Sequence, residues 1–204
     1  MPTFELEQNL LQKGYKAIVG VDEAGRGAWA GPLYAGAVVI APENAEHFID
    51  VTDSKKLSAQ KREELFAIIT KNSTAWAVGF VTAEEIDTLG LTKANQTACE
   101  RAIAGLSHTP DYALLDGRLE VSQIPFESIV KGDSLSFSIA AASILAKVSR
   151  DHEMLNYHLQ YPEYCFNEHV GYGTKKHQEA LAQHGVLPIH RKSYAPIRAL
   201  LQKK

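Results

Sequence analysis

Three short apolar runs in this chain end in carboxylates that stand next to glycines. The run IVGVDEAG contains Asp22 and Glu23, YALLDG ends at Asp116, and PFESIVKGD ends at Asp133. Each run has the composition of a β-strand. Asp-Gly and Gly-Asp are also common turn dipeptides, but three of them at strand ends, one with a doubled acid, favour a shared site. If the strands lie side by side with these ends at one edge, four carboxylates converge there.

Strands alternate with helices along the rest of the chain, which predicts an α/β domain. The run FSIAAASILAKVSRDHEMLNYHLQ is the strongest helix, and its AAAS segment allows another element to approach closely. Pro162 ends this helix, and we expect a loop with Pro188 and Pro196 after the last helix. The predicted strands cover residues 17–22, 34–41, 76–81, 112–117 and part of 125–133, and the predicted helices cover 59–71, 92–106, 137–161 and 174–184.

Composition restricts the class of protein. With 204 residues, 45% of them hydrophobic, the chain is long enough for one globular domain with a substantial core. The N-terminus lacks the basic and apolar regions of a signal peptide, and no run approaches the ~20 apolar residues that span a bilayer. Cys99 and Cys165 stand far apart without CxxC spacing, so neither a disulfide framework nor a cysteine zinc site is indicated. We expect a cytoplasmic protein without a membrane partner.

Charge is distributed unevenly along the chain. The formal net charge is −3, which argues weakly against binding nucleic acid by bulk charge alone. Residues 171–204 nevertheless contain seven Lys or Arg residues and a single acid, Glu179. Such a cationic segment is compatible with phosphate binding and equally with a solvated basic tail.

The predicted carboxylate cluster indicates metal-dependent chemistry. Two unit charges ~4 Å apart repel by ~4 kcal/mol at an effective dielectric of ~20, so such a cluster requires cations. Carboxylates suit Mg²⁺ or Mn²⁺ rather than Zn²⁺, and two such ions ~3.5 to 4 Å apart can clamp both oxygens of a phosphodiester displacement. Adjacent strand residues point to opposite faces, so Asp22 and Glu23 converge only if the strand breaks. Gly25, Gly27 and Gly31 provide a place for that break.

Motifs of several other chemistries are missing from the sequence. The loop GRGAWAGP lacks the GK[ST] ending of a phosphate-binding P-loop, and G-x-G-x-x-G, G-x-S-x-G and HExxH do not occur. His169, His177, His184 and His190 gather late in the chain without zinc-ligand spacing. We expect most of them to be surface or hydrogen-bonding residues.

Six motifs occur in order between about residues 17 and 198. They are DEAGRG with a following AGP, TDSKKLS, LLDG, KGDSLSFSIAAASILAKVSRD, YP.Y.F..H.GYGT..H and HRKSY. With these motifs the chain resembles the bacterial ribonuclease HII family, a type 2 ribonuclease H family. The resemblance implies a ribonuclease H-like mixed sheet flanked by helices over residues 1–160. It also implies a small helical, basic, substrate-binding segment over residues 161–204, packed on the core as part of one domain.

The resemblance also implies an activity. Members are metal-dependent endonucleases that hydrolyse the RNA strand of RNA–DNA hybrids. They nick duplex DNA on the 5′ side of single embedded ribonucleotides, leaving a 3′-hydroxyl and a 5′-phosphate. We therefore expect a monomeric enzyme that uses Mn²⁺ or Mg²⁺, and that acts in ribonucleotide excision repair and in primer removal during DNA replication.

Site residues follow from the resemblance, position by position. It implies catalytic and metal-binding roles for Asp22, Glu23, Asp116 and Asp133. The stretch Gly25-Arg26-Gly27 matches a loop whose backbone contacts the ribose 2′-hydroxyl, the group that distinguishes RNA from DNA. Tyr172 matches a tyrosine that stacks on the sugar following the ribonucleotide. Positions near the phosphate backbone correspond to Lys55, Ser143 and Lys147, for which ordinary surface roles also stay open.

Three positions depart from the usual family pattern. Cys165 stands where glycine is usual, Val170 where lysine is usual, and Tyr194 where phenylalanine is usual. The valine removes one potential phosphate contact. Two alternatives are a ribonuclease HIII-like hybrid nuclease and a non-catalytic hybrid-binding protein. Ribonuclease HIII usually carries an extra N-terminal domain, for which the 21 residues before Asp22 leave no room, and the presence of all four acids argues against a silent protein.

Overall fold

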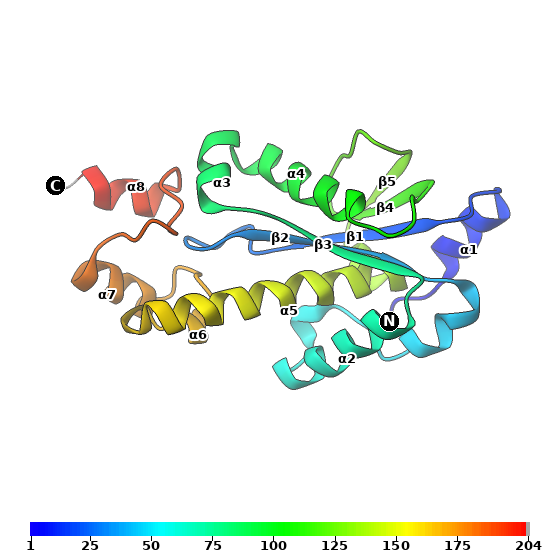
Figure 1. Cartoon of the computed structure of the whole chain (residues 1–204), viewed down its shortest axis with the longest axis horizontal. Helices are drawn as coiled ribbons and strands as arrows, with labels where there is room; N and C mark the ends of the chain where they lie inside the picture. Colours follow the sequence, from blue (N-terminus) through cyan, green and yellow to red (C-terminus); the bar gives the residue numbers. More distant parts are fainter. Residues whose placement is uncertain (203–204) are drawn as a thin grey trace.

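The computed structural model describes residues 1–202 and contains a five-stranded mixed sheet (Figure 1). Strand order is β3-β2-β1-β4-β5, with β1 antiparallel to β2 and parallel to β4. β2 is antiparallel to β3, and β4 is parallel to β5. The strands are β1 (Ile18–Ala24), β2 (Leu33–Val39), β3 (Ala75–Val81), β4 (Tyr112–Asp116) and β5 (Phe126–Ile129). The predicted fold class, a mixed sheet flanked by helices, is confirmed.

Helices cover both faces of the sheet. α3 and α4 lie on one face, and α5 and α2 lie on the other (Figure 1). The helices are α1 (Glu5–Gln12), α2 (Ala59–Asn72), α3 (Ala83–Leu89), α4 (Leu91–Ala104), α5 (Phe137–Gln160), α6 (Phe166–His169), α7 (Lys175–His184) and α8 (Ala195–Gln202). None of the helices in the described range is long and apolar enough to cross a membrane.

Most element predictions are correct, and the exceptions have local causes. The predicted helices correspond to α2, α4, α5 and α7 within two residues at each end. α3 was not predicted, although Thr82 and Glu85 form the reciprocal capping box that the sequence TAEE allows. The expectation of a loop around Pro196 is wrong, because α8 begins at Ala195. Proline is tolerated in a first helical turn, where its missing N–H leaves no bond unmade.

Close packing of α5 on the sheet determines where its side chains emerge. A Cβ atom at Gly20 of β1 would lie 2.1 Å from the carbonyl carbon of Ser138, and one at Gly36 of β2 would lie 2.3 Å from the carbonyl oxygen of Ala142. The predicted close approach of the AAAS segment is therefore confirmed. Because the helix backbone rests directly on β1 and β2, Ser143 comes to lie beside the end of β1.

The C-terminal segment packs on the far end of α5. Its apolar residues include Tyr164, Phe166 and Ile197, and they form a buried cluster with Met154 of α5 and with Ala30. α5 is long enough to contact both the sheet and this cluster (Figure 1). The segment therefore lies against the loop that joins β1 to β2. Lys203 and Lys204 lie outside the described residues.

Candidate active site

The ends of three parallel strands bring the four predicted carboxylates to one edge of the sheet. β1 and β4 pair as far as Val21 and Leu115, so Asp22 and Asp116 follow at the same edge. β5 ends at Ile129, and Asp133 lies in the 3-10 turn Gly132–Ser134 beyond it. The backbone N–H of Gly132 donates to Asp116 Oδ1 at 2.7 Å. Asp133 is thereby fixed next to Asp116.

The predicted break of β1 occurs at the glycines, but it comes after the paired acids, so it does not bring Asp22 and Glu23 to one face. β1 stays paired with β2 through Ala24 and Tyr34, and the chain leaves extended geometry only at Gly25, where φ is +92°. Asp22 faces α5 and lies near Ser143, whereas Glu23 faces α4 and Asn95. Both carboxylates still border one cleft, because pairing between β1 and β4 ends just before them.

Electrostatic conditions in the cluster disfavour charge. Asp22 is 3% exposed, and burial, followed by the charges of Glu23 and Asp116, raises its pKa well above the usual value. Burial also raises the pKa of Glu23 and of Asp133. Arg26 and Lys55 oppose these shifts, at 3.8 Å from Glu23 and from Asp133 respectively.

These carboxylates have the donor chemistry of a hard divalent cation site. Asp22 Oδ2 is buried without a hydrogen-bond partner, and such an atom is costly unless a donor or a cation reaches it. Among residues 1–202 no three acidic, imidazole or thiol side chains are already close enough together to form a metal site. The residues fit an oxygen-preferring cation by chemistry and by the unsatisfied atom.

A cleft of about 300 Å³ contains nearly all of the predicted site residues. Asp133 is the exception, and it lies at the edge of the cleft within reach of Lys55 Nζ. Lys147 borders the cleft but donates to Asp151 at 2.8 Å. The predicted residues in the cleft wall are Asp22, Glu23, Gly25, Arg26, Gly27, Lys55, Asp116, Ser143, Lys147 and Tyr172.

Two polar residues near the acids were not predicted. Ser54 Oγ lies 2.8 Å from Ser143 Oγ, and both side chains are buried. This contact joins the TDSKKLS segment to α5 and carries Lys55 over the carboxylates. Burial raises the pKa of Glu23, and a hydrogen bond from Asn95, 1% exposed on α4, opposes that rise. Nothing in its local sequence distinguishes Asn95 from a surface asparagine.

Two buried arginines support the glycine loop of residues 25–32. Arg150 lies so close beneath Gly25 that a Cβ there would be 1.9 Å from its Nε. It donates to the carbonyls of Pro32 and Ala30, at 3.0 and 3.2 Å. Arg191 donates to the carbonyls of Gly31 and Arg26, at 3.1 and 3.0 Å. Arg191 is fully buried and therefore does not belong to a cationic surface, which corrects the expectation from charge counting.

Buried neutral histidines support the turn that carries Tyr172. The Leu187 N–H donates to His190 Nδ1 at 2.9 Å, so the neutral ring carries its proton on Nε2. That proton is donated to His177 Nε2 at 3.0 Å, and His177 Nδ1 donates to the carbonyl of Tyr172 at 3.0 Å. Burial lowers the pKa of His177 and of His190 to about 4. The predicted hydrogen-bonding role of the histidines is confirmed for these two.

A family model described as ribonuclease HII matches residues 19–197. The chain belongs to the ribonuclease HII family.

Individual relatives agree with this membership. The ribonuclease HII of Acholeplasma laidlawii is 50% identical over 197 residues, which cover 97% of this chain and 96% of that protein. The crystal structure of ribonuclease H2 from Pyrococcus horikoshii has a TM-score of 0.79 at 28% identity, covering 92% of this chain and 98% of that one. Ribonuclease HII of Archaeoglobus fulgidus, solved in complex with PCNA, has a TM-score of 0.74 at 25% identity, covering 88% and 95%.

Membership in the ribonuclease HII family makes the chain an endoribonuclease of the hybrid-cleaving ribonuclease H type. This membership decides against both alternatives. The matching model is that of ribonuclease HII and not of ribonuclease HIII, and the relatives named ribonuclease HII are nucleases, not silent binding proteins.

The three residues that depart from the ribonuclease HII pattern differ in backbone conformation or in hydrogen bonding from what the usual residue would have. Cys165 and Val170 adopt left-handed backbone conformations, with φ of +54° and +43°. Glycine adopts this conformation without strain, which accounts for its usual place at position 165. Tyr194 donates its hydroxyl to the carbonyl of Arg26 at 2.6 Å and accepts from Arg191 at 2.9 Å. A phenylalanine would make neither bond.

Proposed function

We propose that this chain nicks duplex DNA on the 5′ side of single embedded ribonucleotides, as well as cleaving the RNA strand of hybrids. The products are a 3′-hydroxyl and a 5′-phosphate. One observation carries the proposal: the strand-end carboxylates, the Gly25–Gly27 loop and Tyr172 border the same cleft. Groups for phosphodiester chemistry and groups for sugar recognition are thus within reach of one nucleotide.

Asp22, Glu23, Asp116 and Asp133 would bind Mn²⁺ or Mg²⁺, with two ions as the expected number. When bound, the ions supply positive charge at the attacking and leaving oxygens of the phosphodiester. The buried Asp22 Oδ2 without a partner, and the raised pKa of Asp22, Glu23 and Asp133, support a site that accepts cations. Lys55, 3.8 Å from Asp133, keeps that carboxylate oriented and adds charge near the substrate backbone.

Recognition of the ribonucleotide is assigned to the other side of the cleft, which contains the Gly25–Gly27 loop and Tyr172. Gly25 and Gly27 lack side chains, so the loop backbone is open to a 2′-hydroxyl, which both donates and accepts hydrogen bonds. Tyr172 is 39% exposed and lies over the Arg150 guanidinium, whose carbon is 5.6 Å from the ring centroid. One face of the ring is supported by the protein, and the ring is free to stack on the sugar of the next nucleotide. Ser143 and Lys147 border the same cleft, where they would contact phosphates.

A labelled DNA duplex with one ribonucleotide tests the proposal. With Mn²⁺ or Mg²⁺ we expect a nick on the 5′ side of the ribonucleotide, a 3′ end that a polymerase extends, and a 5′-phosphate that ligase accepts after gap filling. The same duplex with a 2′-O-methyl group at that position is the matched control, and it should resist cleavage. Intact substrate with both metals, or a nick on the 3′ side, would contradict the proposal.

The cellular setting follows from this activity. A nick beside a misincorporated ribonucleotide begins its excision, and cleavage of hybrids removes RNA primers during replication. We propose a monomer acting in the cytoplasm on these substrates, with residues 161–202 contributing to substrate binding.

A further inference from the structure

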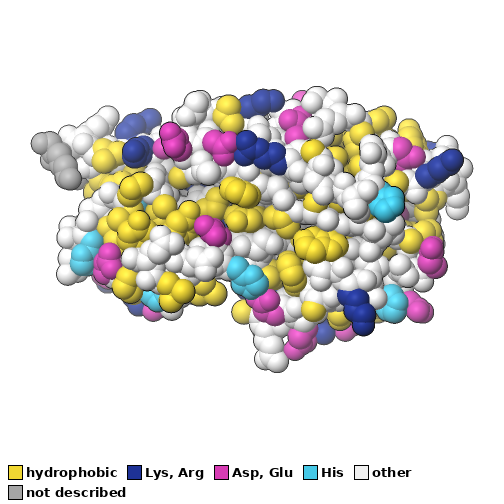
Figure 2. All heavy atoms as spheres, viewed as in Figure 1, with side chains coloured by type: hydrophobic (Ala, Val, Ile, Leu, Met, Phe, Trp, Pro, Cys, Tyr) yellow, Lys and Arg dark blue, Asp and Glu magenta, His cyan; other side chains and the backbone are white. Residues whose placement is uncertain are grey.

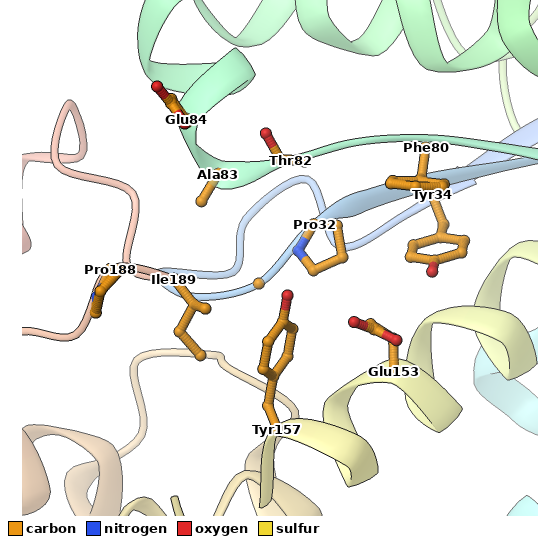
Figure 3. A pocket seen from close by; sticks show the side chains of 11 residues that line it. Pro32, Tyr34, Phe80, Thr82, Ala83, Glu84, Glu153, Tyr157, Pro188 and Ile189 are labelled. Carbon is orange, nitrogen blue, oxygen red and sulfur yellow. The ribbon is translucent and has the colours of Figure 1, made fainter. Parts of the chain in front are cut away.

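A second cavity, of about 470 Å³, lies between β2, the end of β3, α5 and the C-terminal segment (Figure 3). Its walls include Tyr34, Phe80, Glu153, Tyr157, Pro188 and Ile189. It shares no lining residue with the carboxylate cleft. Nothing in the nuclease chemistry requires it.

Three aromatic rings shape this cavity. Tyr34 and Phe80 are register partners on β2 and β3, and their rings stack with centroids 5.3 Å apart at an angle of 21°. Phe80 is 47% exposed. Tyr157 extends from α5 with its hydroxyl directed into the cavity (Figure 3). Aromatic faces carry negative quadrupole charge and attract cations at close range.

One carboxylate is directed into the same cavity. The side chain of Glu153 points from α5 toward the space between Tyr157 and Tyr34 (Figure 3). It accepts a hydrogen bond from Asn156 Nδ2 at 3.4 Å but forms no ion pair with any residue in the described range 1–202. Burial raises the pKa of Tyr34 to about 12, and the charge of Glu153 adds to that shift. Glu84 lies on the rim, with its carboxylate turned away from the cavity.

The surroundings of the cavity are apolar and acidic. Hydrophobic side chains gather between α3 and α5 on this face, with acidic side chains among and above them and Lys or Arg side chains beside the upper acids (Figure 2). Arg150 lies behind the wall formed by Gly31 and Pro32, and Arg101 donates to the carbonyl of Phe80 at 2.7 Å and pairs with Glu85. Two of the Arg150 donors are engaged by the carbonyls of Ala30 and Pro32. Arg150 is buried and therefore leaves the cavity lining without a cationic side chain.

We propose that this cavity receives the guanidinium group of an arginine presented by a protein partner. A guanidinium plane stacks on Tyr and Phe rings and pairs with a carboxylate, and it loses less hydration energy than an ammonium group on entering such a site. Charge favours this occupant over nucleic acid, because Glu153 and Glu84 repel phosphates. Since the cavity and the cleft share no residue, the partner binds while the cleft is open to substrate.

A peptide titration of the full chain tests this site. The probe is the capped tripeptide acetyl-Gly-Arg-Gly-amide, and the readout is the amide NMR shifts of Thr82, Ala83 and Ile189 around the cavity. We expect saturable shifts with a Kd on the order of 1 mM, since one arginine side chain makes few contacts. The citrulline peptide, which has the same shape without the charge, should leave these amides unshifted.

Variants distinguish binding of the peptide in the cavity from its non-specific attraction to acidic residues elsewhere on the surface. Glu153→Gln should weaken arginine-peptide binding about tenfold or more, whereas Glu163→Gln, an exposed acid on the C-terminal segment, should leave it unchanged. Tyr157→Leu should also weaken binding, with circular dichroism confirming that the variant folds.

The proposal would be overturned by no shift at these amides at tens of millimolar peptide, by equal shifts with the citrulline peptide, or by equal affinity in Glu153→Gln. Shifts at these amides produced by a DNA or RNA oligonucleotide instead would assign the cavity to nucleic acid and would equally overturn it.

Discussion

The two walls of the active-site cleft are built in opposite ways. The acidic wall consists of Asp22, Glu23, Asp116 and Asp133, whose charges repel one another and leave a buried oxygen without a partner. The loop wall consists of residues 25–32 and 170–173, whose carbonyls accept hydrogen bonds from buried arginines and neutral histidines.

Because of this difference, the two walls depend on different interactions for their stability. The acidic wall is made by side chains at or just beyond strand ends, and we expect its charged form to be stabilised by cations from solution. The loop wall is held by Arg150 and Arg191, which donate to loop carbonyls 118 to 165 positions away in sequence, and by histidines close to Tyr172 in sequence. Arg150 Nη1 and Arg191 Nη2 are buried without a hydrogen-bond partner, but the wall contains no cluster of like charges that calls for an ion. We therefore expect the proposed chemistry to depend on a bound ion, and the proposed substrate recognition to depend on the integrity of the C-terminal packing.

The largest expected effect is at the acidic wall. Asp116→Asn should lower turnover roughly 10³-fold or more, because it removes one carboxylate from the cation site. The fold should persist, since asparagine Oδ1 still accepts from the Gly132 N–H. Asp111→Asn, at the opposite end of β4, is the matched control and should keep its turnover. Steady-state cleavage of a labelled hybrid measures both, and full activity in Asp116→Asn would remove this residue from the site.

The next effect concerns the histidines of the loop wall. The pKa of about 4 for His177 and for His190 lies below the value of ~6.5 in an unfolded chain. The unfolded state therefore binds more protons between about pH 6.5 and pH 4, and stability falls as pH decreases through that window. We expect a loss of up to about 3 kcal/mol for each ring, complete only below about pH 4.

Urea unfolding at several pH values measures this loss, and NMR titration identifies its source. His177 and His190 should stay neutral down to about pH 5. Titration of either buried ring between pH 6 and 7 would show that the loop wall is not supported by neutral imidazoles.

Tyr172→Ala tests whether the loop wall reads a junction between RNA and DNA. Loss of the ring should reduce cleavage at a lone ribonucleotide about tenfold more than cleavage of a long hybrid, since one stacking contact contributes ~1 to 3 kcal/mol. Tyr172→Phe keeps the ring and should keep the preference. The ratio of kcat/KM for the two substrates is the measurement, and an equal loss on both would defeat the role.

The smallest effect concerns the hydroxyl of Tyr194. Tyr194→Phe removes the contacts with Arg26 and Arg191, and we expect a destabilisation of about 1 kcal/mol in urea. Tyr15→Phe, whose hydroxyl makes no hydrogen bond in the described structure, should change stability by no more than about 0.5 kcal/mol. Equal stability of Tyr194→Phe and the natural chain would show that the loop wall does not depend on this bond.

Short-range patterns in the sequence were sufficient to predict much of the fold and most of the residues of the acidic wall. The alternation of strands and helices, Pro162 and the AAAS segment each act through short-range sterics or propensity, so the sequence indicates them directly. α3 and α8 were missed at a capping box and at a first-turn proline, both of which have recognisable sequence signals.

Other features depended on long-range contacts. Asn95 and Ser54 contribute to the acidic wall through contacts with Glu23 and Ser143, across 72 and 89 positions of sequence. No periodicity or spacing encodes such contacts, because they depend on where helices cross the sheet.

The sequence by itself determined the residue chemistry: four acids at strand ends, a glycine loop and the family that contains them. Only the tertiary structure decided how Asp22 and Glu23 share a cleft, since β1 remains regular and the pairing with β4 ends just before them. It also decided that Arg191 lies beneath the loop, although charge counting had placed it on a cationic surface. Charge and hydropathy are properties of single residues, whereas burial is a property of the packed chain, and that is why only the fold distinguishes a supporting cation from a surface one.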